Sequence, residues 1–376
     1  MSNFKVEETK QVYGAKIKVI GVGGGGGNMI NHMVKDNMKG IDLIAANTDA
    51  QALENSLATV KIQIGERTTR GLGSGGKAEV GRASAEESYE EIKSALEHAD
   101  IVFIASGLGG GTGTGAAPLV AQAAKEVGAL TVSIVTKPFA FEGKKRMGSA
   151  EKGLAELTKE SDSIVVIPND KLLSIIDANL GVRESFEIVD NVLCRAVSGM
   201  SGVILSKGII NVDFADVQTV MSHRGKALLG VGESTGTDAA NDAVRNAIQS
   251  PLLDDMSING ALGVLVHFYA HPKDCPLRKL QEAMNIVYDA AKSDEADIIF
   301  GITTDESIKE GYVRVTIVAT GFDSQIANIP IVTNKPTINR ERPLSINTSN
   351  MVLVSGSDSM QEDYLDIPTI IRNQMD

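Results

Sequence analysis

The sequence has no tryptophan, few other aromatic residues and almost no cysteine. Aromatic residues make up 4% of its 376 residues, and two cysteines, Cys194 and Cys275, are too few for a disulfide framework. Both are expected to be reduced thiols. No apolar run approaches the roughly 20 residues of a membrane-spanning helix. The opening residues, MSNFKVEETKQ, lack a hydrophobic signal region. These absences predict a cytosolic protein.

Positive charge is scarce relative to negative charge. Lys and Arg number 36 against 48 Asp and Glu, giving a formal net charge of −12. Because neutralising nucleic-acid phosphates needs a basic face, this excess argues against nonspecific DNA or RNA binding. Of the five histidines, His267 and His271 are four residues apart, but His267 lies in the strand-like stretch VLVHFYA, which His271 directly follows, so this spacing does not place both on one helical face. No metal-ligand cluster is therefore expected.

Short apolar runs alternate with helical stretches in the first half of the chain. Runs that are apolar throughout are typical of parallel strands buried on both faces. The predicted strands are KIKVIGV, DLIAAN, KIQI, DIVFIAS, LTVSIVT and SIVVIP. Helices are expected between them, for example over Lys77–His98 and Ala116–Val127. The pattern predicts a doubly wound α/β fold.

A long helix is predicted next, over Arg183–Ser206, where apolar residues recur every three or four positions. Such a helix most simply forms a spine between two domains. A second, smaller α/β unit is expected to follow and to end near Phe322. Its predicted helices are Asp216–Leu229, Asp238–Gln249 and PLRKLQEAMNIVYDAAKS, and its predicted strands are ALGVLVHFYA, ADIIFGITT and YVRVTIVAT.

The composition changes after this unit. Residues 323–360 are rich in Asn, Ser, Thr and Pro and poor in aromatics, which is typical of a flexible linker. The last stretch, QEDYLDIPTIIRNQMD, regains hydrophobic residues. It is too short to fold alone and is predicted to be a binding peptide.

The first of three glycine-rich stretches is KVIGVGGGGGNMI. It follows a strand and opens a helix, the arrangement that offers free backbone N–H groups to a phosphate. Gly21, Gly23 and Gly26 also match the dinucleotide fingerprint G-x-G-x-x-G. That interpretation needs an acidic residue after the next strand, where Asn47 and Asp49 give only a loose match. A dinucleotide-dependent oxidoreductase is therefore one possible class.

The second and third glycine-rich stretches differ in how well they match a phosphate-binding loop. GLGSGGKA, over residues 71–78, has Ala78 where a P-loop needs a hydroxyl, and no strand precedes it. It is either a surface loop or a lid over a phosphate. The third, Gly107–Gly115, follows a strand and opens a helix, with two threonines interleaved among its glycines. Hydroxyls and bare N–H groups together can hold phosphate oxygens from several sides.

The motif GGGTGTG resembles the signature of the tubulin/FtsZ family of GTPases. The motifs GVGGGGGN, NTDAQAL, TKPFAFEGKKR, IPNDKLL and NVDFADV agree with that family in order and spacing, from about Lys16 to Phe322, and the tail also matches. The resemblance implies a tubulin-like α/β fold with a doubly wound GTPase domain, a central helix, a smaller C-terminal α/β domain and a disordered linker and tail. The implied segments are an N-terminal extension (1–15), a GTP-binding domain (16–182), the central helix (183–206), a C-terminal domain (207–322), a linker (323–360) and a partner-binding peptide (361–376).

The resemblance also assigns the nucleotide site, motif by motif. The implied phosphate loops are Gly24, Gly25, Gly26, Gly27 and Asn28; Gly73, Ser74 and Gly75; and Gly109, Gly110, Gly111, Thr112, Gly113, Thr114 and Gly115. Glu142 and Arg146 match the ribose and phosphate positions, and Phe186 and Asp190 match the base site, together with Asn28. A carboxylate suits guanine, whose N1–H and N2–H₂ are donors. Phe186 either stacks on the base or belongs to the apolar stripe of its helix.

The catalytic residues implied by the resemblance are Asn211, Asp213 and Asp216, in NVDFAD. From the residues alone, Asp213 and Asp216 also have the spacing of a helix capping box, and the two roles are compatible. In the family this loop enters the nucleotide site of the next subunit and polarises water, while Mg²⁺ neutralises the phosphates. No motif names a protein ligand for Mg²⁺. Head-to-tail contacts of this kind build open filaments.

The tail residues Asp366, Ile367, Pro368, Ile370, Ile371 and Arg372 are predicted to dock into a partner groove. By resemblance the partners are membrane-anchoring and regulatory division proteins such as FtsA. Direct membrane insertion is not expected because the tail has no basic cluster. The implied role is a cytoplasmic division ring at midcell, beneath the inner membrane. The sequence also leaves open a plasmid-partitioning tubulin relative and a nucleotide-binding scaffold without hydrolysis.

Overall fold

The computed structural model describes residues 14–38, 40–173, 180–205, 213–223, 225–250, 253, 258–274, 276–292 and 296–322, with only the backbone of residues 182 and 183. All of these belong to one compact unit, Met1–Ile329. Asn211, Cys275, the predicted linker and the predicted tail peptide lie outside the described residues.

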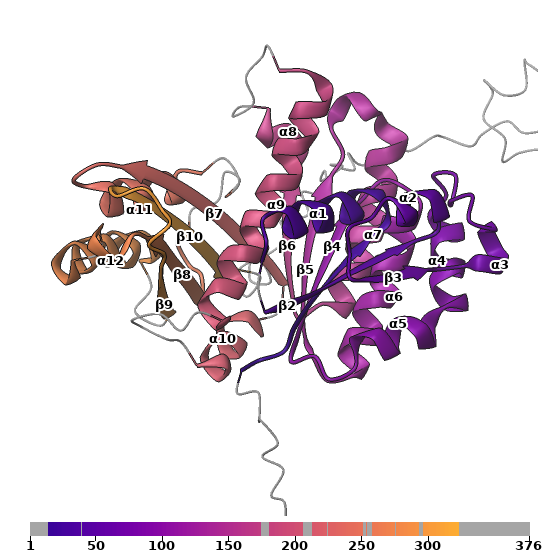
Figure 1. The fold of residues 1–376 in the computed structure, drawn as a ribbon, viewed down its shortest axis with the longest axis horizontal. Coiled ribbons are helices and arrows are strands. Elements are labelled where there is room, and N and C mark those ends of the chain that lie inside the picture. Colours follow the sequence, from indigo (N-terminus) through magenta and orange to yellow (C-terminus); the bar gives the residue numbers. More distant parts are fainter. Residues whose placement is uncertain are drawn as a thin grey trace, which may run out of the picture. The chain divides into compact units, whose positions relative to one another are not determined.

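One sheet runs through the described part of the chain, with the strand order β3-β2-β1-β4-β5-β6-β7-β10-β8-β9 (Figure 1). Strands β1 to β6 are parallel, and β7 pairs parallel with β6 but antiparallel with β10. The strands are β1 (Ile17–Val22), β2 (Ile41–Asn47), β3 (Val60–Gln63), β4 (Ile101–Gly107), β5 (Leu130–Lys137), β6 (Ser163–Pro168), β7 (Gly225–Thr235), β8 (Gly263–Ala270), β9 (Asp297–Thr304) and β10 (Tyr312–Thr320).

Helices cover both faces of the parallel part of the sheet, which confirms the doubly wound prediction. One buried cluster joins β1, β4 and β5 to α1 (Gly23–Lys35), α9 (Val182–Leu205) and α10 (Phe214–Met221). On the other face, α4 (Ala78–Glu87), α5 (Tyr89–Leu96), α6 (Thr112–Glu126) and α7 (Lys144–Glu160) pack over the same strands. A third cluster joins β8 and β10 to α11 (Ala239–Ile248) and α12 (Leu277–Ala291). The short helices are α2 (Ala50–Glu54), α3 (Glu66–Thr69) and α8 (Asn169–Leu172).

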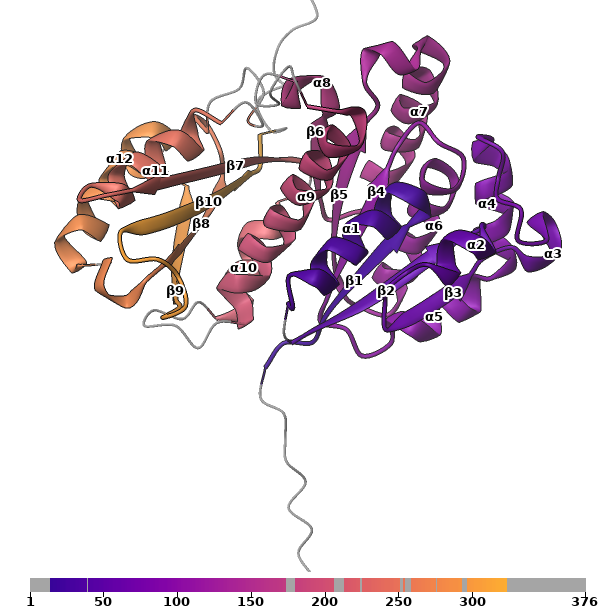
Figure 2. The same cartoon turned by 45° about the horizontal axis from the view of Figure 1, so that its top comes forward.

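The predicted spine helix is α9, which lies between the two parts of the sheet (Figure 2). Among the described helices it is the one that could cross a membrane by length and composition, over Glu184–Leu205. Its apolar stripe instead packs into the core, where Leu193, Val197 and Met200 are buried. It is a core helix that joins two halves of the molecule.

Two predicted elements are wrong in extent. The helix expected over Asp216–Leu229 ends at Met221 as α10, and the chain then forms β7. The strand was not predicted because its glycines are atypical of a strand interior. Gly230 and Gly232 are needed there because they pack against α11, where a Cβ would lie 2.3 Å and 2.1 Å from backbone oxygens. The helix expected over Lys77–His98 is interrupted at Ser88 and forms α4 and α5.

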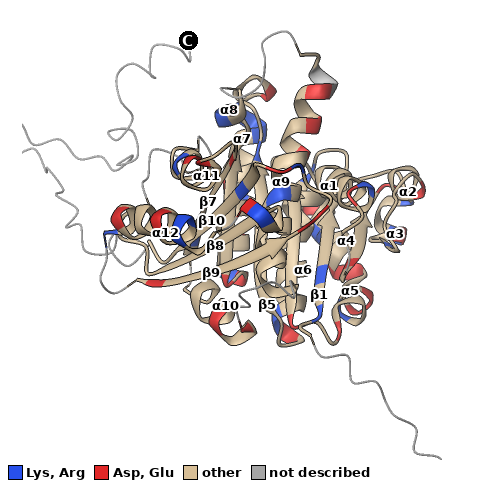
Figure 3. Cartoon of the chain, turned by 60° about the vertical axis from the view of Figure 1, so that its left-hand side comes forward, with Lys and Arg blue, Asp and Glu red and all other residues tan. Residues whose placement is uncertain are grey.

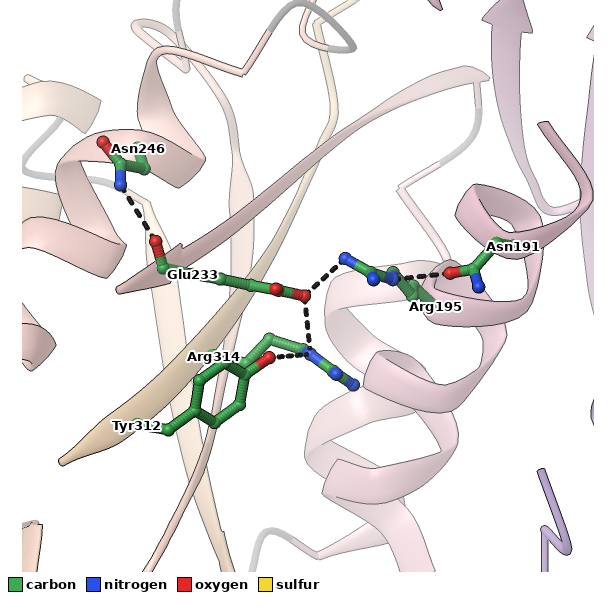
Figure 4. Close-up of polar contacts among 6 residues, drawn as sticks. All are labelled: Asn191, Arg195, Glu233, Asn246, Tyr312 and Arg314. Atoms are coloured by element: carbon green, nitrogen blue, oxygen red, sulfur yellow. Dashed lines mark hydrogen bonds and ion pairs between the residues drawn. The ribbon is translucent and has the colours of Figure 1, made fainter. Parts of the chain in front are cut away.

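A polar cluster joins α9 to β7 and β10 (Figure 4). The carboxylate of Glu233 accepts hydrogen bonds from the guanidinium groups of Arg195 on α9 and Arg314 on β10. Arg314 also lies 3.2 Å from the hydroxyl of Tyr312, and Arg195 bonds to Asn191 one turn earlier on its helix. The central helix is thus fixed to both strands through one acidic side chain. Elsewhere in the view of Figure 3, acidic and basic residues are interspersed over the helices and loops.

Candidate functional site

Two helix N-termini meet at the carboxyl edge of the sheet. Strands β1 and β4 are adjacent and parallel, with Val22 opposite Ser106. Helix α1 begins directly after β1, and α6 begins at Thr112, four residues earlier than the sequence predicted. Among the described residues no side chain caps either helix. Their first-turn N–H groups and the positive ends of their dipoles are therefore available to an anion.

The glycines of these loops serve two different purposes. Some let backbones touch: a Cβ on Gly23 would lie 2.9 Å from Gly113 N, and one on Gly113 would lie 2.4 Å from the hydroxyl of Ser106. Others face open space, since a Cβ on Gly24, Gly27 or Gly110 would meet nothing within 4 Å. The packed glycines that also belong to the predicted loops are Gly25, Gly26, Gly109, Gly111 and Gly115. The packed glycines hold the loops together, and the open glycines leave exposed backbone that a ligand can approach.

A chain of three buried hydroxyls ties the second glycine-rich loop to the third. Thr112 Oγ1 lies 2.7 Å from Thr48 Oγ1 and 3.0 Å from Ser74 Oγ. The N–H of Gly73 donates to the carbonyl of Thr48 at 3.2 Å, and Gly75 follows with a positive φ of 60°. Residues 71–76 therefore lie against the third glycine-rich loop, the position that the lid interpretation requires.

Inside the third loop, Gly109 N donates to Thr114 Oγ1 at 2.8 Å, which closes the loop on itself.

Asp49, the acidic residue that the dinucleotide interpretation would need, accepts from the backbone N–H groups of Gln51 and Ala52 and caps α2. Its carboxylate is thus engaged in a local cap, which weakens the dinucleotide interpretation further.

The segment after β5 holds Glu142 and Arg146 together. Glu142 accepts from the N–H of Phe139 at 2.8 Å and pairs with Arg146 at 2.5 Å, across one turn. Beside it, at the end of β6, Asn169 is buried and its Oδ1 has no hydrogen-bond partner among the described residues. Asn169 was not among the residues predicted for the site. Its position directly after a parallel strand, in the motif IPNDKLL, was the available signal.

The predicted base contacts lie on the first turns of α9. Phe186 is 38% exposed and meets Phe139 edge-on, with ring centroids 5.5 Å apart. It is not part of the buried stripe. Asp190 is buried one turn later, and burial, with a smaller contribution from Glu187, raises its pKa to about 7. Asn28 is exposed in the first turns of α1, which packs against α9.

Asp213 and Asp216 lie at the start of α10 and are exposed. Asp213 has the extended backbone of an N-cap residue, but its side chain makes no capping hydrogen bond with the described residues. The capping box that the spacing suggested is therefore not formed, and both carboxylates face outward.

The described residues include no group of three or more His, Cys, Asp or Glu side chains that could hold a metal ion. Cys194 is a free, buried thiol whose pKa is raised to about 12, chiefly by burial and then by Asp36. It is a free thiol, as the sequence predicted, and its raised pKa disfavours the reactive thiolate.

Two open helix N-termini at the parallel part of the sheet, with three contacting glycine loops and an exposed aromatic ring nearby, define a nucleotide-binding protein. Comparison with known proteins gives the family. The model described as Tubulin/FtsZ family, GTPase domain, matches residues 16–177, and the model described as FtsZ family, C-terminal domain, matches residues 225–323. The chain belongs to the tubulin/FtsZ family.

Similar proteins extend over nearly the whole chain. Cell division protein FtsZ of Helicobacter pylori (strain ATCC 700392 / 26695) is 47% identical over 368 residues, or 96% of this chain and 93% of that protein. The protein of that name from Wigglesworthia glossinidia brevipalpis is 44% identical over 377 residues, or 96% and 97%. A solved structure titled FtsZ dimer, empty (M. jannaschii) matches with a TM-score of 0.79 and 46% identity, covering 84% of this chain and 90% of that one. The predicted tubulin-like fold and GTP-binding GTPase class are confirmed, and the oxidoreductase class is set aside.

Proposed function

We propose that this GTPase polymerises head-to-tail into cell-division filaments and hydrolyses GTP at the contact between successive subunits. Similarity to proteins named Cell division protein FtsZ, and to a solved FtsZ dimer, supports the filament-forming role. The nucleotide would lie on the open glycines, with Glu142 and Arg146 at the ribose and phosphates and Asn28, Phe186 and Asp190 at guanine.

The distance between the nucleotide loops and α10 supports an active site shared between two subunits. Asp190 and Leu205 lie on the same helix, so at 1.5 Å per residue they are roughly 22 Å apart. Asp213 follows Leu205 in the chain, and α10 packs beneath β8 and β9, at the end of α9 remote from α8 (Figures 1 and 2). Asp213 and Asp216 are therefore too far from the nucleotide loops of their own subunit. A second subunit, stacked end to end, would bring them to the γ-phosphate.

In this arrangement Asp213 and Asp216, with Asn211 in the preceding segment, orient and polarise the water that attacks the γ-phosphorus. The loop N–H groups and Arg146 stabilise charge on the phosphate oxygens. The described residues fit a Mg²⁺ held mainly by phosphate oxygens and water, since no protein cluster is available for it. When bound, Mg²⁺ neutralises phosphate charge.

Light scattering tests the assembly. The protein is mixed with Mg²⁺ and with GTP, GDP or NADH in parallel. Scattering that rises with GTP alone supports the proposal. A rise with NADH, or equal rises with GTP and GDP, would contradict it.

We also propose that the filament assembles in the cytoplasm at midcell and that residues 366–372 recruit it to membrane-anchoring and regulatory division proteins such as FtsA. Many weak tails on one filament would bind by avidity. Deleting residues 364–376 should leave GTP hydrolysis intact and abolish recruitment to vesicles coated with the anchor protein. Equal co-sedimentation of the truncated and full-length chains would show that the tail is not the docking segment.

A further inference from the structure

The second glycine-rich loop ends in Lys77, at the position that a lysine occupies in a P-loop. Gly75 and Gly76 have positive φ values of 60° and 74°, and the N–H of Lys77 donates to the carbonyl of Ser74 at 3.1 Å. These contacts close a tight turn whose two central residues need the left-handed backbone that glycine adopts easily. The hydroxyl of Ser74 lies within hydrogen-bond distance of Thr112 in the third loop. The turn therefore fixes where the backbone of Lys77 lies relative to that loop.

The backbone of Lys77 lies directly against the third loop. A Cβ on Gly111 would lie 2.8 Å from Lys77 N, and a Cβ on Gly81, one turn into α4, would lie 2.4 Å from Gly111 O. The first turns of α4 and α6 are therefore in contact. Within the same loop, Gly110 faces open space. The flexible four-carbon stem of Lys77 thus begins next to the exposed backbone on which the phosphates are proposed to lie.

The charge of Lys77 has no protein partner that explains it. Lys77 is exposed, and within the described ranges no acidic side chain forms an ion pair with it. By contrast, Arg146, the other basic residue proposed to lie near the phosphates, pairs with Glu142. Lys77 is the N-cap of α4, where a lysine offers no acceptor to the first-turn N–H groups and opposes the positive end of the helix dipole. Helix stability therefore does not favour a lysine at this position, whereas an anionic ligand does.

The order of the strands places Lys77 at the end of the site remote from the base residues. Phe186 meets Phe139, which follows β5. At the other end, Leu72 of the second loop forms a bridge with Asp49, just beyond the carboxyl end of β2. Strands β1 and β4, which lead into the first and third loops, lie between β2 and β5. A nucleotide with its base at Phe186 and its phosphates on these loops therefore points its terminal phosphate towards the loop that carries Lys77.

We propose that Lys77 binds the terminal phosphate of GTP and gives the protein a preference for GTP over GDP. Its ammonium group donates charge-assisted hydrogen bonds to oxygens of the γ-phosphate, which GDP lacks. The inference rests on the proposed placement of the nucleotide on the open glycines. It adds a specific cation, supplied by the second loop, that distinguishes the two nucleotides.

The test measures the affinities of full-length protein for fluorescently labelled GTP and GDP in Mg²⁺, below the concentration at which it assembles. Wild type is compared with Lys77→Gln, Lys77→Arg and Lys125→Gln. Lys125 is the matched control, because it is an exposed lysine in the last turn of α6. Replacing it changes the net charge equally, but at a site roughly 20 Å along the helix from Thr112.

Lys77→Gln should bind GTP at least about tenfold more weakly than wild type and GDP within about twofold, the scale for losing one hydrogen bond to a charged group. Lys77→Arg keeps the positive charge and should retain most of the preference for GTP. Lys125→Gln should bind both nucleotides as wild type does. A structural role for Lys77 would weaken GTP and GDP binding equally, and that result, or an unchanged GTP affinity, would overturn the inference.

Gly110→Ala separates this inference from the proposed placement of the nucleotide. If Gly110→Ala weakens GTP binding while Lys77→Gln leaves the ratio of GTP to GDP affinity unchanged, the placement holds and the role of Lys77 is wrong. If Gly110→Ala binds GTP as wild type does, the placement is wrong and the inference falls with it. Weaker GTP binding by Gly110→Ala, together with a selective loss of GTP affinity in Lys77→Gln, supports both.

Discussion

The hydroxyl of Thr112 lies 2.7 Å from the hydroxyl of Thr48, in a buried chain of hydrogen bonds that continues to Ser74. Removing the middle member leaves the other two hydroxyls without their shared partner and releases the lid loop from the phosphate loop. Thr112→Ala should lower the free energy of unfolding by about 1–3 kcal/mol, the cost of leaving buried hydroxyls unpaired, and should weaken GTP binding because the loop at residues 71–76 is released.

Thr112→Ser retains the hydroxyl and should bind nearly as wild type does. Thr158→Ala is the matched control, because that hydroxyl bonds only to its own helix, at Leu154 O. Titration of unassembled protein with labelled GTP measures all three. Equal affinity of Thr112→Ala and the control would contradict the role of the hydroxyl chain.

Two glycines of the third loop should respond differently to the same substitution. A Cβ on Gly113 would lie 2.4 Å from Ser106 Oγ and 2.7 Å from Gly107 O, so Gly113→Ala should lower the thermal midpoint of unfolding. A Cβ on Gly110 would meet nothing within 4 Å, so Gly110→Ala should fold normally and weaken GTP binding by intruding on the ligand. Melting curves and GTP titration distinguish the two. A stable Gly113→Ala protein with full affinity would refute the assignment of that glycine to packing.

The shared carboxylate of Glu233 should contribute to the stability of the junction between α9, β7 and β10. Glu233→Gln leaves Arg195 and Arg314, both half-buried, without their acidic partner. We expect unfolding by urea to become easier by about 1–3 kcal/mol, less than for a fully buried pair because water screens the cluster. Adding Arg195→Gln should recover part of the loss by relieving repulsion. A double variant no more stable than the single one would contradict this explanation.

Stability should fall in mild acid because of His267. This side chain lies inside β8, where its Nε2 is 2.8 Å from Thr303 Oγ1, and burial followed by Arg314 lowers its pKa to about 4. The unfolded chain binds a proton near pH 6.5 and the folded chain near pH 4, so this contribution is complete above pH 6.5 and is lost as the pH falls towards 4. The loss is about 1.4 kcal/mol per pH unit across that window. Urea unfolding of wild type and His267→Gln at pH 7 and pH 5 measures it. The difference in stability between the two proteins should shrink at pH 5, and a constant difference would contradict the explanation.

The parts of the fold that the sequence predicted are those governed by local pattern. The strands β1, β2, β4, β5 and β6 are mostly apolar, and α9 has a continuous apolar stripe, so these elements follow from the hydrophobic pattern of the sequence. Strand β7 could not be predicted in this way. Its glycines are required by contact with α11, and a contact between segments distant in the chain produces no periodic pattern in the sequence. The junction at Glu233 is non-local in the same way.

The candidate site likewise has features that local sequence predicts and features that depend on contacts between distant segments. Glycine loops after strands are visible in sequence because backbone N–H groups bind phosphate wherever the loop has that form. Which glycines are open and how Thr112 joins two loops both depend on how separate elements of the fold meet. Asn169 was missed because its place after β6 is a weak signal by itself, and its buried Oδ1 without a partner among the described residues is seen only in three dimensions.

The central claim is that each hydrolytic site is built from two subunits, and mixing two defective proteins tests it most directly. Asp213→Ala should bind GTP and assemble but hydrolyse at least about 10²-fold more slowly. Gly110→Ala should retain the aspartates but bind GTP poorly. In mixed filaments, an intact nucleotide loop of the first variant meets an intact Asp213 of the second at up to about a quarter of the contacts. The account predicts GTP turnover by the mixture well above the sum of the two proteins alone. Co-sedimentation of both variants with turnover no greater than that sum would contradict it.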